Sequence, residues 1–160
     1  MTYTPAQPAP PREEGMAVVK SIRTLDGRPA ADIKGGSLVV VTVEIALPQE
    51  SHYIVVDDPL PGGLEAVNGS FLTESEEDLR QIEAGDEEGW PSWLGFNHVE
   101  LRDDRVLLFA DWLPAGVHRH RYLARALSYG TFRMPGSKAE EMYAPEVFGR
   151  SAEREVRVVK

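Results

Sequence analysis

Two histidines separated by one residue, His118 and His120, come nearest in type and spacing to a catalytic or metal centre. On a strand, residues two apart point to the same face, so both imidazoles and the ring of Tyr122 would lie together. Two neutral imidazoles could serve one zinc or iron ion, as in a cupin-like metal enzyme. The remaining histidines have no spacing that ties them to this pair as a third ligand. The alternative is a semi-polar inner face on which the two histidines and Tyr122 pack with small alanines.

Other catalytic arrangements are missing from the sequence. A hydrolase needs a nucleophile beside a base or paired carboxylates in a cleft, and the serines stand in turn-like contexts without a G-x-S-x-G elbow. Gly62-Gly63 lacks the Lys and Ser or Thr of a phosphate-binding loop. Asp57-Asp58-Pro59 is interpreted as a strand end entering a turn, where Asp caps backbone amides. The sequence therefore predicts neither enzyme activity nor a cofactor.

Large apolar side chains gather in the segment from Glu140 to Arg150, where Met142, Tyr143 and Phe148 surround Pro145 and a glycine. Proline and glycine interrupt strand pairing, so we expect an irregular loop. Large apolar groups on such a loop usually cover something. Either Met142 and Tyr143 cap the end of the domain's own sandwich, or they shield a neighbouring domain.

Charge and composition exclude several classes of partner. The 160 residues carry 26 Asp and Glu against 17 Lys and Arg, a formal net charge of -9, which repels phosphate backbones and anionic lipid headgroups. Nucleic acid and direct membrane insertion are therefore not expected, and no apolar run is long enough for a transmembrane helix. With no cysteine, the chain can form neither a disulfide nor a thiolate metal site.

Short apolar runs between turn residues predict an all-β domain. Strands are expected at Ala17 to Thr24, Ser37 to Leu47, Tyr53 to Asp58, Leu64 to Asn68, Phe96 to Leu101, Val106 to Asp111, Val117 to Leu127, Thr131 to Met134 and Glu155 to Val159. Leu101 and Val106, which flank four polar residues, indicate a tight hairpin. Many short strands at this spacing favour an antiparallel sandwich.

Two segments lie outside this strand pattern. Residues 1–15 hold four prolines and almost no large apolar side chain, so they are expected to be a disordered linker or tail, with the domain spanning residues 16–160. Glu74 to Ala84 is predicted to be a short helix, with Thr73 as its N-cap and Gly85 as its stop. Its many acidic side chains indicate either a solvated insertion or a docking surface for a basic partner.

Four stretches of the sequence, in the same order along the chain, resemble one known family. They run from Val56 through Asp57-Asp58-Pro59-Leu60-Pro61-Gly62-Gly63-Leu64 to Glu65, from Phe96 to Val106, from Tyr122 to Ala126, and through the segment Glu140 to Arg150. Together they are similar to the carboxy-terminal macroglobulin domain (MG10, of the receptor-binding type) of bacterial alpha-2-macroglobulins. The likeness extends from about Met16 to Lys160.

The resemblance implies a fibronectin- or immunoglobulin-like macroglobulin β-sandwich, with the helix of residues 74–84 as an insertion. It also implies a function that belongs to a much larger protease inhibitor. In that family a protease cuts a bait region, the molecule rearranges, and a Cys-Gln thioester in a separate helical domain reacts with the attacker. The family further implies an exported, periplasmic and often lipid-anchored protein of host defence, associated with peptidoglycan synthases.

By position in the family motif, Met142 and Tyr143 are the pair that covers the thioester against water by steric exclusion. Glu141, Pro145 and Phe148 are the further interface candidates. The implied partners are the thioester domain, the neighbouring macroglobulin domains and, through the larger protein, the target proteases. The alternative is a self-contained β-sandwich module for adhesion or ligand binding, in which Met142 and Tyr143 finish the core.

Overall fold

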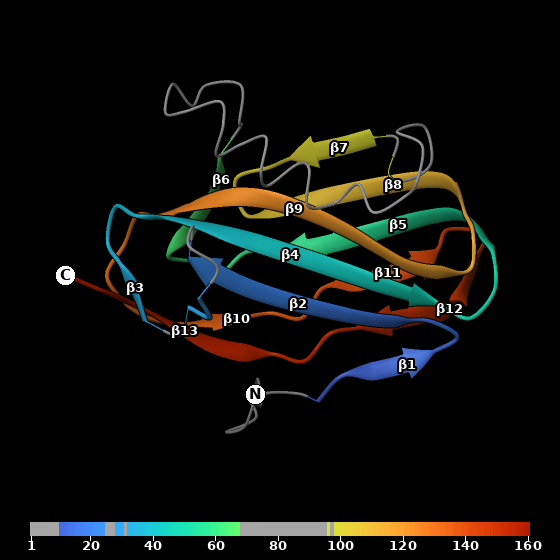
Figure 1. Ribbon diagram of the computed structural model, residues 1–160, viewed down its shortest axis with the longest axis horizontal. Coiled ribbons are helices and arrows are strands. Elements are labelled where there is room, and N and C mark those ends of the chain that lie inside the picture. The colour runs from blue at the N-terminus through green and yellow to red at the C-terminus, as the bar shows by residue number, and fades with distance from the viewer. Residues whose placement is uncertain (1–9, 25–27, 31, 68–95, 97) are drawn as a thin grey trace, which may run out of the picture.

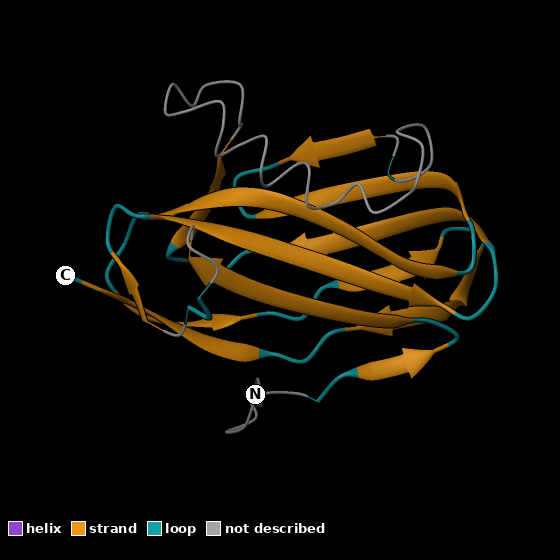
Figure 2. Ribbon diagram, in the orientation of Figure 1, coloured by secondary structure: helices purple, strands orange, loops and turns teal. Residues whose placement is uncertain are grey.

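The computed structural model describes residues 10–24, 28–30, 32–67, 96 and 98–160. Strands and loops make up this part, as Figure 2 shows, and it contains no helix that is long and apolar enough to cross a membrane. The strands are β1 (Arg12–Glu14), β2 (Ala17–Thr24), β3 (Asp32–Lys34), β4 (Leu38–Leu47), β5 (Ser51–Pro59), β6 (Leu64–Val67), β7 (His98–Leu101), β8 (Arg105–Leu113), β9 (Gly116–Ala126), β10 (Gly130–Met134), β11 (Lys138–Glu141), β12 (Ala144–Arg150) and β13 (Arg154–Val159).

The strands form two stacked sheets and a smaller third one (Figure 1). One large sheet has the order β2-β4-β9-β6 and the other the order β1-β12-β11-β5-β8-β7. The small sheet, β10-β13-β3, lies at the end of the molecule where the chain terminates. All pairings between named strands are antiparallel except that of β13 with β3, which is parallel. The predicted antiparallel β-sandwich is therefore confirmed, with one parallel pair that the sequence analysis did not expect.

The core lies between the two large sheets. Strand β4 directs Val41, Val43 and Ile45 inward, and β5 of the opposite sheet contributes Ile54 and Val56; all five are fully buried or nearly so. This alternation of buried and less buried side chains is the period-2 pattern by which the strands were predicted. All nine predicted strands are present; β2 has the predicted ends, and the others differ by one or two residues at one end or both.

Glycines admit an aromatic ring where the chain turns from β5 into β6. A Cβ on Gly63 would lie 2.5 Å from the ring of Phe132, which is too close for any real side chain. Gly63 thus has a packing role at the edge of the core, whereas a Cβ on Gly62 would make only ordinary contact with the same ring, at 3.4 Å.

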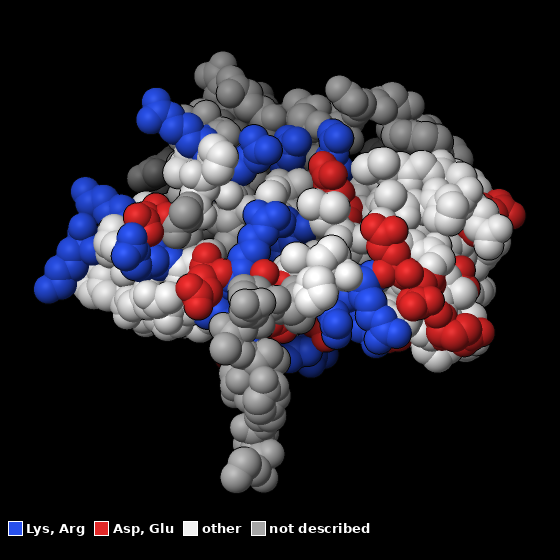
Figure 3. Space-filling view, turned by 90° about the horizontal axis from the view of Figure 1, so that it is seen from below, with Lys and Arg blue, Asp and Glu red and all other residues white. Residues whose placement is uncertain are grey.

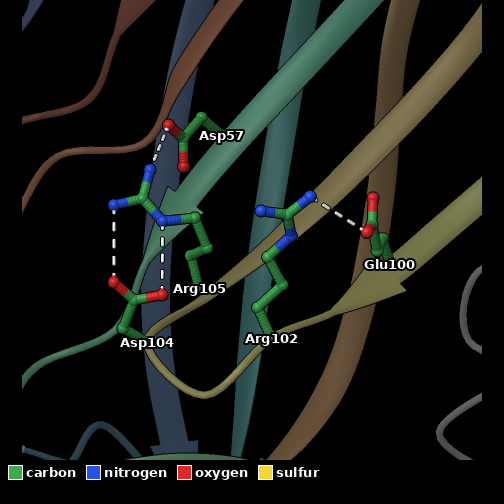
Figure 4. A network of polar contacts seen from close by, with 5 residues as sticks. All are labelled: Asp57, Glu100, Arg102, Asp104 and Arg105. Atoms are coloured by element: carbon green, nitrogen blue, oxygen red, sulfur yellow. Dashed lines mark hydrogen bonds and ion pairs between the residues drawn. The ribbon is translucent and has the colours of Figure 1, made fainter.

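The predicted hairpin between Leu101 and Val106 is confirmed, since these two residues pair as the last step of the β7–β8 ladder. Ion pairs surround its turn, as Figure 4 shows. Arg105 donates to Asp57 of β5 at 2.8 Å and also lies 3.4 Å from Asp104 of the turn. The turn is thereby tied to the neighbouring strand.

Two of the expectations meet a different outcome, and a third falls on residues that the structure does not describe. The segment from Glu140 onward is a hairpin, β11 and β12, so the expected irregular loop is wrong: Pro145 lies beside a β-bulge between Glu140 and Glu141, and Gly149 pairs in both ladders of β12. Residues 12–14, within the expected linker, form β1 against β12. The predicted helix of residues 74–84 lies outside the described residues.

Candidate interaction surface at the β11–β12 turn

Met142 and Tyr143 form the two-residue turn that joins β11 to β12. Their side chains are 50% and 81% exposed, so neither belongs to the core between the sheets. The pairing of Glu141 with Ala144 closes the turn, directly after the bulge. The structure therefore presents one flexible apolar side chain and one aromatic ring side by side at the tip of a hairpin.

Strand β5 supports this tip from the side. The backbone N–H of Met142 donates to the carbonyl of Tyr53 at 2.8 Å, and the hydroxyl of Ser51 donates to Glu141 Oε1 at 2.5 Å. The ring of Tyr53 meets that of Tyr143 edge to face, with 5.2 Å between ring centroids and 90° between planes. Edge-to-face contact is a favoured arrangement of aromatic rings. Tyr53 and Ser51 were not predicted as part of the site, because nothing in the local sequence pattern couples β5 to the turn.

The other interface candidates are distributed along the hairpin. Pro145 is exposed and is the second residue of β12, and Glu141 is half-buried and accepts the hydrogen bond of Ser51. Phe148 lies farther along β12, where Arg12 and Lys138 place cationic groups 5.4 and 5.3 Å from its ring centroid. Glu141, Met142, Tyr143 and Pro145 thus form one surface, and Phe148 packs with cations of β1 and β11 instead.

Charges are unevenly distributed around this end of the molecule. In Figure 3 acidic side chains gather toward the end where β12 begins, while basic ones are spread over the rest of this face, some of them beside the acidic group. Glu140, Glu141 and Glu146 lie on the hairpin itself. The tip is therefore apolar at its centre and acidic at its rim.

The two side chains at the turn differ in polarity. A thioether is a weak hydrogen-bond acceptor, whereas a phenol hydroxyl both donates and accepts hydrogen bonds. Both side chains occupy volume from which they displace water when another surface packs on them. The turn therefore presents apolar and aromatic surface on which another surface could pack.

A buried polar cluster lies inside the sandwich, and the sequence analysis did not predict it. Lys20 of β2 reaches across to Asp58 of β5, with 2.5 Å between Nζ and Oδ1, and both side chains are inaccessible to solvent. Lys20 also donates to the carbonyl of Pro59 at 2.6 Å. The hydroxyls of Tyr122 and Ser137 donate to the two oxygens of Asp58. Asp58 therefore pairs with a cation in the core, and its interpretation as a cap of backbone amides is wrong.

Burial sets the protonation of this cluster. Loss of water lowers the pKa of Lys20, and the nearby carboxylate of Asp58 opposes that shift. Burial, followed by the charge of Asp58, raises the pKa of Tyr122 well above its ordinary value. Tyr122 thus stays a neutral donor. The signal in the sequence was Lys20 itself, a charged residue on the apolar face of β2 between Val18 and Ile22.

The histidine pair lies where the strand spacing predicted. His118 and His120 point to the same side of β9 as Tyr122 and both are half-buried. His118 Nε2 lies 2.7 Å from the carbonyl of Pro114, and the ring of His120 contacts the rings of Phe96 and Tyr122. Burial lowers the pKa of His120, with Asp58 opposing the shift. Within the described ranges, no three His, Asp or Glu side chains are placed to share a metal ion.

Comparison with known proteins identifies the fold. The family model described as "Bacterial Alpha-2-macroglobulin MG10 domain" matches residues 15–146. An alpha-2-macroglobulin homolog from Nostoc sp. is 40% identical over 119 residues, which make up 74% of this chain and 6% of that protein.

Solved structures agree with this match. The native conformation of Escherichia coli alpha-2-macroglobulin superposes with a TM-score of 0.80 at 26% identity, over 98% of this chain and 10% of that one. The E. coli protein activated by porcine elastase gives a TM-score of 0.81 at 24% identity, over 98% of this chain and 14% of that one. The chain thus spans a small part of the length of its relatives. It belongs to the bacterial alpha-2-macroglobulin family, as a macroglobulin-like domain of the MG10 type.

Proposed function

We propose that this domain serves within a longer alpha-2-macroglobulin as the cover of an internal thioester. The observation that carries the proposal is the exposure of Met142 and Tyr143 at a turn that β5 holds by a backbone hydrogen bond and a ring contact. Exposed apolar side chains on an ordered hairpin are suited to bury against a partner. The partner in this proposal is the thioester domain of the same protein.

Shielding would work by exclusion of water. A thioester is an acyl group that hydrolyses when water or hydroxide reaches it, and packing Met142 and Tyr143 over it keeps both away. The acidic side chains around the tip would remain at the rim of the interface, where water is present. Bait cleavage would then separate the two domains and expose the bond. In this role the domain binds and excludes, and it catalyses nothing.

The wider role of the protein follows from the family. We infer a protease trap that is exported to the periplasm, takes part in host defence and meets target proteases through its other domains. Association with a peptidoglycan synthase is part of the same proposal. The net charge of -9 is consistent with partners that are proteins rather than nucleic acids.

The test is the reaction of the longer protein with methylamine, a small nucleophile that consumes an exposed thioester. Tyr143→Ala should open the cover, so we expect severalfold faster consumption of methylamine and faster release of the thiol. Tyr129→Ala is the matched control, because Tyr129 is 59% exposed and precedes β10, on the small sheet at the opposite end. An unchanged rate in Tyr143→Ala would contradict the shielding role.

A further inference from the structure

Tyr53 has an unusual backbone conformation at the place where β5 meets the β11–β12 turn. Its φ is 53°, in the left-handed region, and no other non-glycine residue among those described has a positive φ. A bulky side chain adopts this conformation at a cost in free energy that glycine avoids. Such a conformation is kept only where surrounding contacts stabilise it. The contacts of Tyr53 therefore indicate the role of its conformation.

The conformation interrupts one ladder of β5. On the side of β8, His52 pairs with Trp112 and Ile54 pairs with Ala110, while Tyr53 itself has no pairing partner in that ladder. On the side of β11, its carbonyl accepts the hydrogen bond of the Met142 N–H at 2.8 Å. The departure from regular strand geometry thus falls at the one residue of β5 whose carbonyl receives the turn.

The side chain of Tyr53 completes the contact. Its ring lies edge to face with that of Tyr143, at 5.2 Å between centroids. Tyr143 is otherwise 81% exposed, and Tyr53 is 49% exposed. One side of the Tyr143 ring is therefore supported from within the domain while the rest remains open to a partner.

We propose that Tyr53 is the positioning residue of the turn: its left-handed backbone fixes Met142, and its ring fixes the rotamer of Tyr143 before any partner is bound. The inference rests on the proposed shielding function. An exposed tyrosine that samples several rotamers must be ordered on binding, which weakens the interface, and a ring held in place beforehand avoids that loss. A tyrosine ring that moves between rotamers also lets water reach the thioester whenever the ring swings away.

Substitutions at Tyr53 separate the contributions of ring and backbone. Tyr53→Phe keeps the ring. Tyr53→Gly removes the ring but accepts the left-handed conformation, and Tyr53→Ala removes the ring and resists that conformation. In the 160-residue chain, NMR would follow hydrogen exchange at the Met142 amide and the χ1 couplings of Tyr143. We expect wild-type values of both readouts in Tyr53→Phe. In Tyr53→Gly the χ1 couplings of Tyr143 should be averaged while the Met142 amide stays protected. In Tyr53→Ala the couplings should be averaged and the Met142 amide should also exchange faster. Tyr129→Ala again serves as the control.

The same variants in the longer protein test the consequence for shielding. We expect Tyr53→Gly to consume methylamine severalfold faster than the wild type but more slowly than Tyr143→Ala. A wild-type rate in Tyr53→Gly beside a raised rate in Tyr143→Ala would overturn this inference and leave the proposed function standing. If Tyr143→Ala itself reacts at the wild-type rate, the proposed function fails. The NMR couplings then decide the positioning role alone: a fixed Tyr143 rotamer in Tyr53→Gly would overturn it.

Discussion

At the scale of single residues, Asp58 is the point where three parts of the domain meet. Its carboxylate accepts from Lys20 of β2, from Tyr122 of β9 and from Ser137, which directly precedes β11. A buried carboxylate without partners would be strongly unfavourable, and one cation and two hydroxyl donors make its burial tolerable. The cluster joins the two large sheets by ionic and hydrogen-bond contacts in addition to apolar packing.

We expect loss of either member of the ion pair to be more harmful than loss of both. Lys20→Met leaves an unpaired carboxylate in the core and Asp58→Leu leaves an unpaired ammonium, and each should lower the free energy of unfolding by about 3–5 kcal/mol. The double variant should recover much of that loss, since two apolar side chains can pack there. Urea denaturation of the four proteins measures the coupling. Additive losses would show that the two charges do not act as a pair.

Residue types and the family resemblance predicted part of this picture. The shared face of His118, His120 and Tyr122 followed from strand spacing, and the prominence of Met142 and Tyr143 followed from the family motif. Asp58 was misread, because a carboxylate beside a proline is commonly a turn residue and only the other sheet supplies its cation. Contacts between distant strands, such as Tyr53 with Tyr143, have no local signature in a single sequence.

At the scale of elements, the hairpin β11–β12 depends on a close crossing at Gly149. A Cβ there would lie 2.5 Å from the backbone carbonyl oxygen of Met16 and 3.1 Å from the side chain of Val18. Backbone cannot move aside as the end of a side chain can. The glycine therefore lets β12 pass close to Met16 and Val18, at the point where the chain leaves β1 of one large sheet and enters β2 of the other.

Gly149→Ala should consequently destabilise the domain. We expect a loss of about 1–3 kcal/mol in the free energy of unfolding, because the added methyl overpacks a buried crossing. Gly62→Ala is the matched control, since the nearest atom to its added Cβ would be 3.4 Å away on the ring of Phe132. Thermal or urea denaturation compares the two. Equal small losses of unfolding free energy in both variants would mean that β12 and β2 move apart easily at Gly149.

Elements with strong alternation were predictable and short or irregular ones were not. Strand β2 matched its predicted range at both ends, and its buried side chains recur at every second residue from Val18 to Ile22, with Lys20 between them. Strands β1 and β3 have three residues each and too little pattern to detect. Strand β12 contains both Pro145 and Gly149, which argue against a strand locally, and pairing with strands on both sides overrides them.

At the scale of the whole molecule, the described strands bury one continuous core, and β1 adds an edge to it. The side chains of β1 are exposed, and its contribution is a short ladder with β12 plus the Arg12 contact to Phe148. The core residues begin at Met16. The domain boundary expected there from composition stays a prediction.

A chain shortened to residues 16–160 tests that boundary. We expect it to unfold in a single cooperative transition, with a free energy of unfolding lowered by about 1–3 kcal/mol, because a few exposed backbone hydrogen bonds are lost. Hydrogen exchange should quicken in β12, which becomes an edge strand, and remain unchanged in β4 and β9. A shortened chain that fails to fold would place β1 within the domain itself.

The ion pair of Lys20 and Asp58 also limits how this sequence can drift over generations. Replacing either residue alone leaves an unpaired charge in the core. A lineage must therefore pass through a less stable protein or change both positions nearly together. Because Tyr122 and Ser137 share the same carboxylate, loss of Asp58 leaves two further hydroxyls without an acceptor. These four positions should therefore vary as a group among relatives, while the exposed residues of the turn are free to follow the surface they meet.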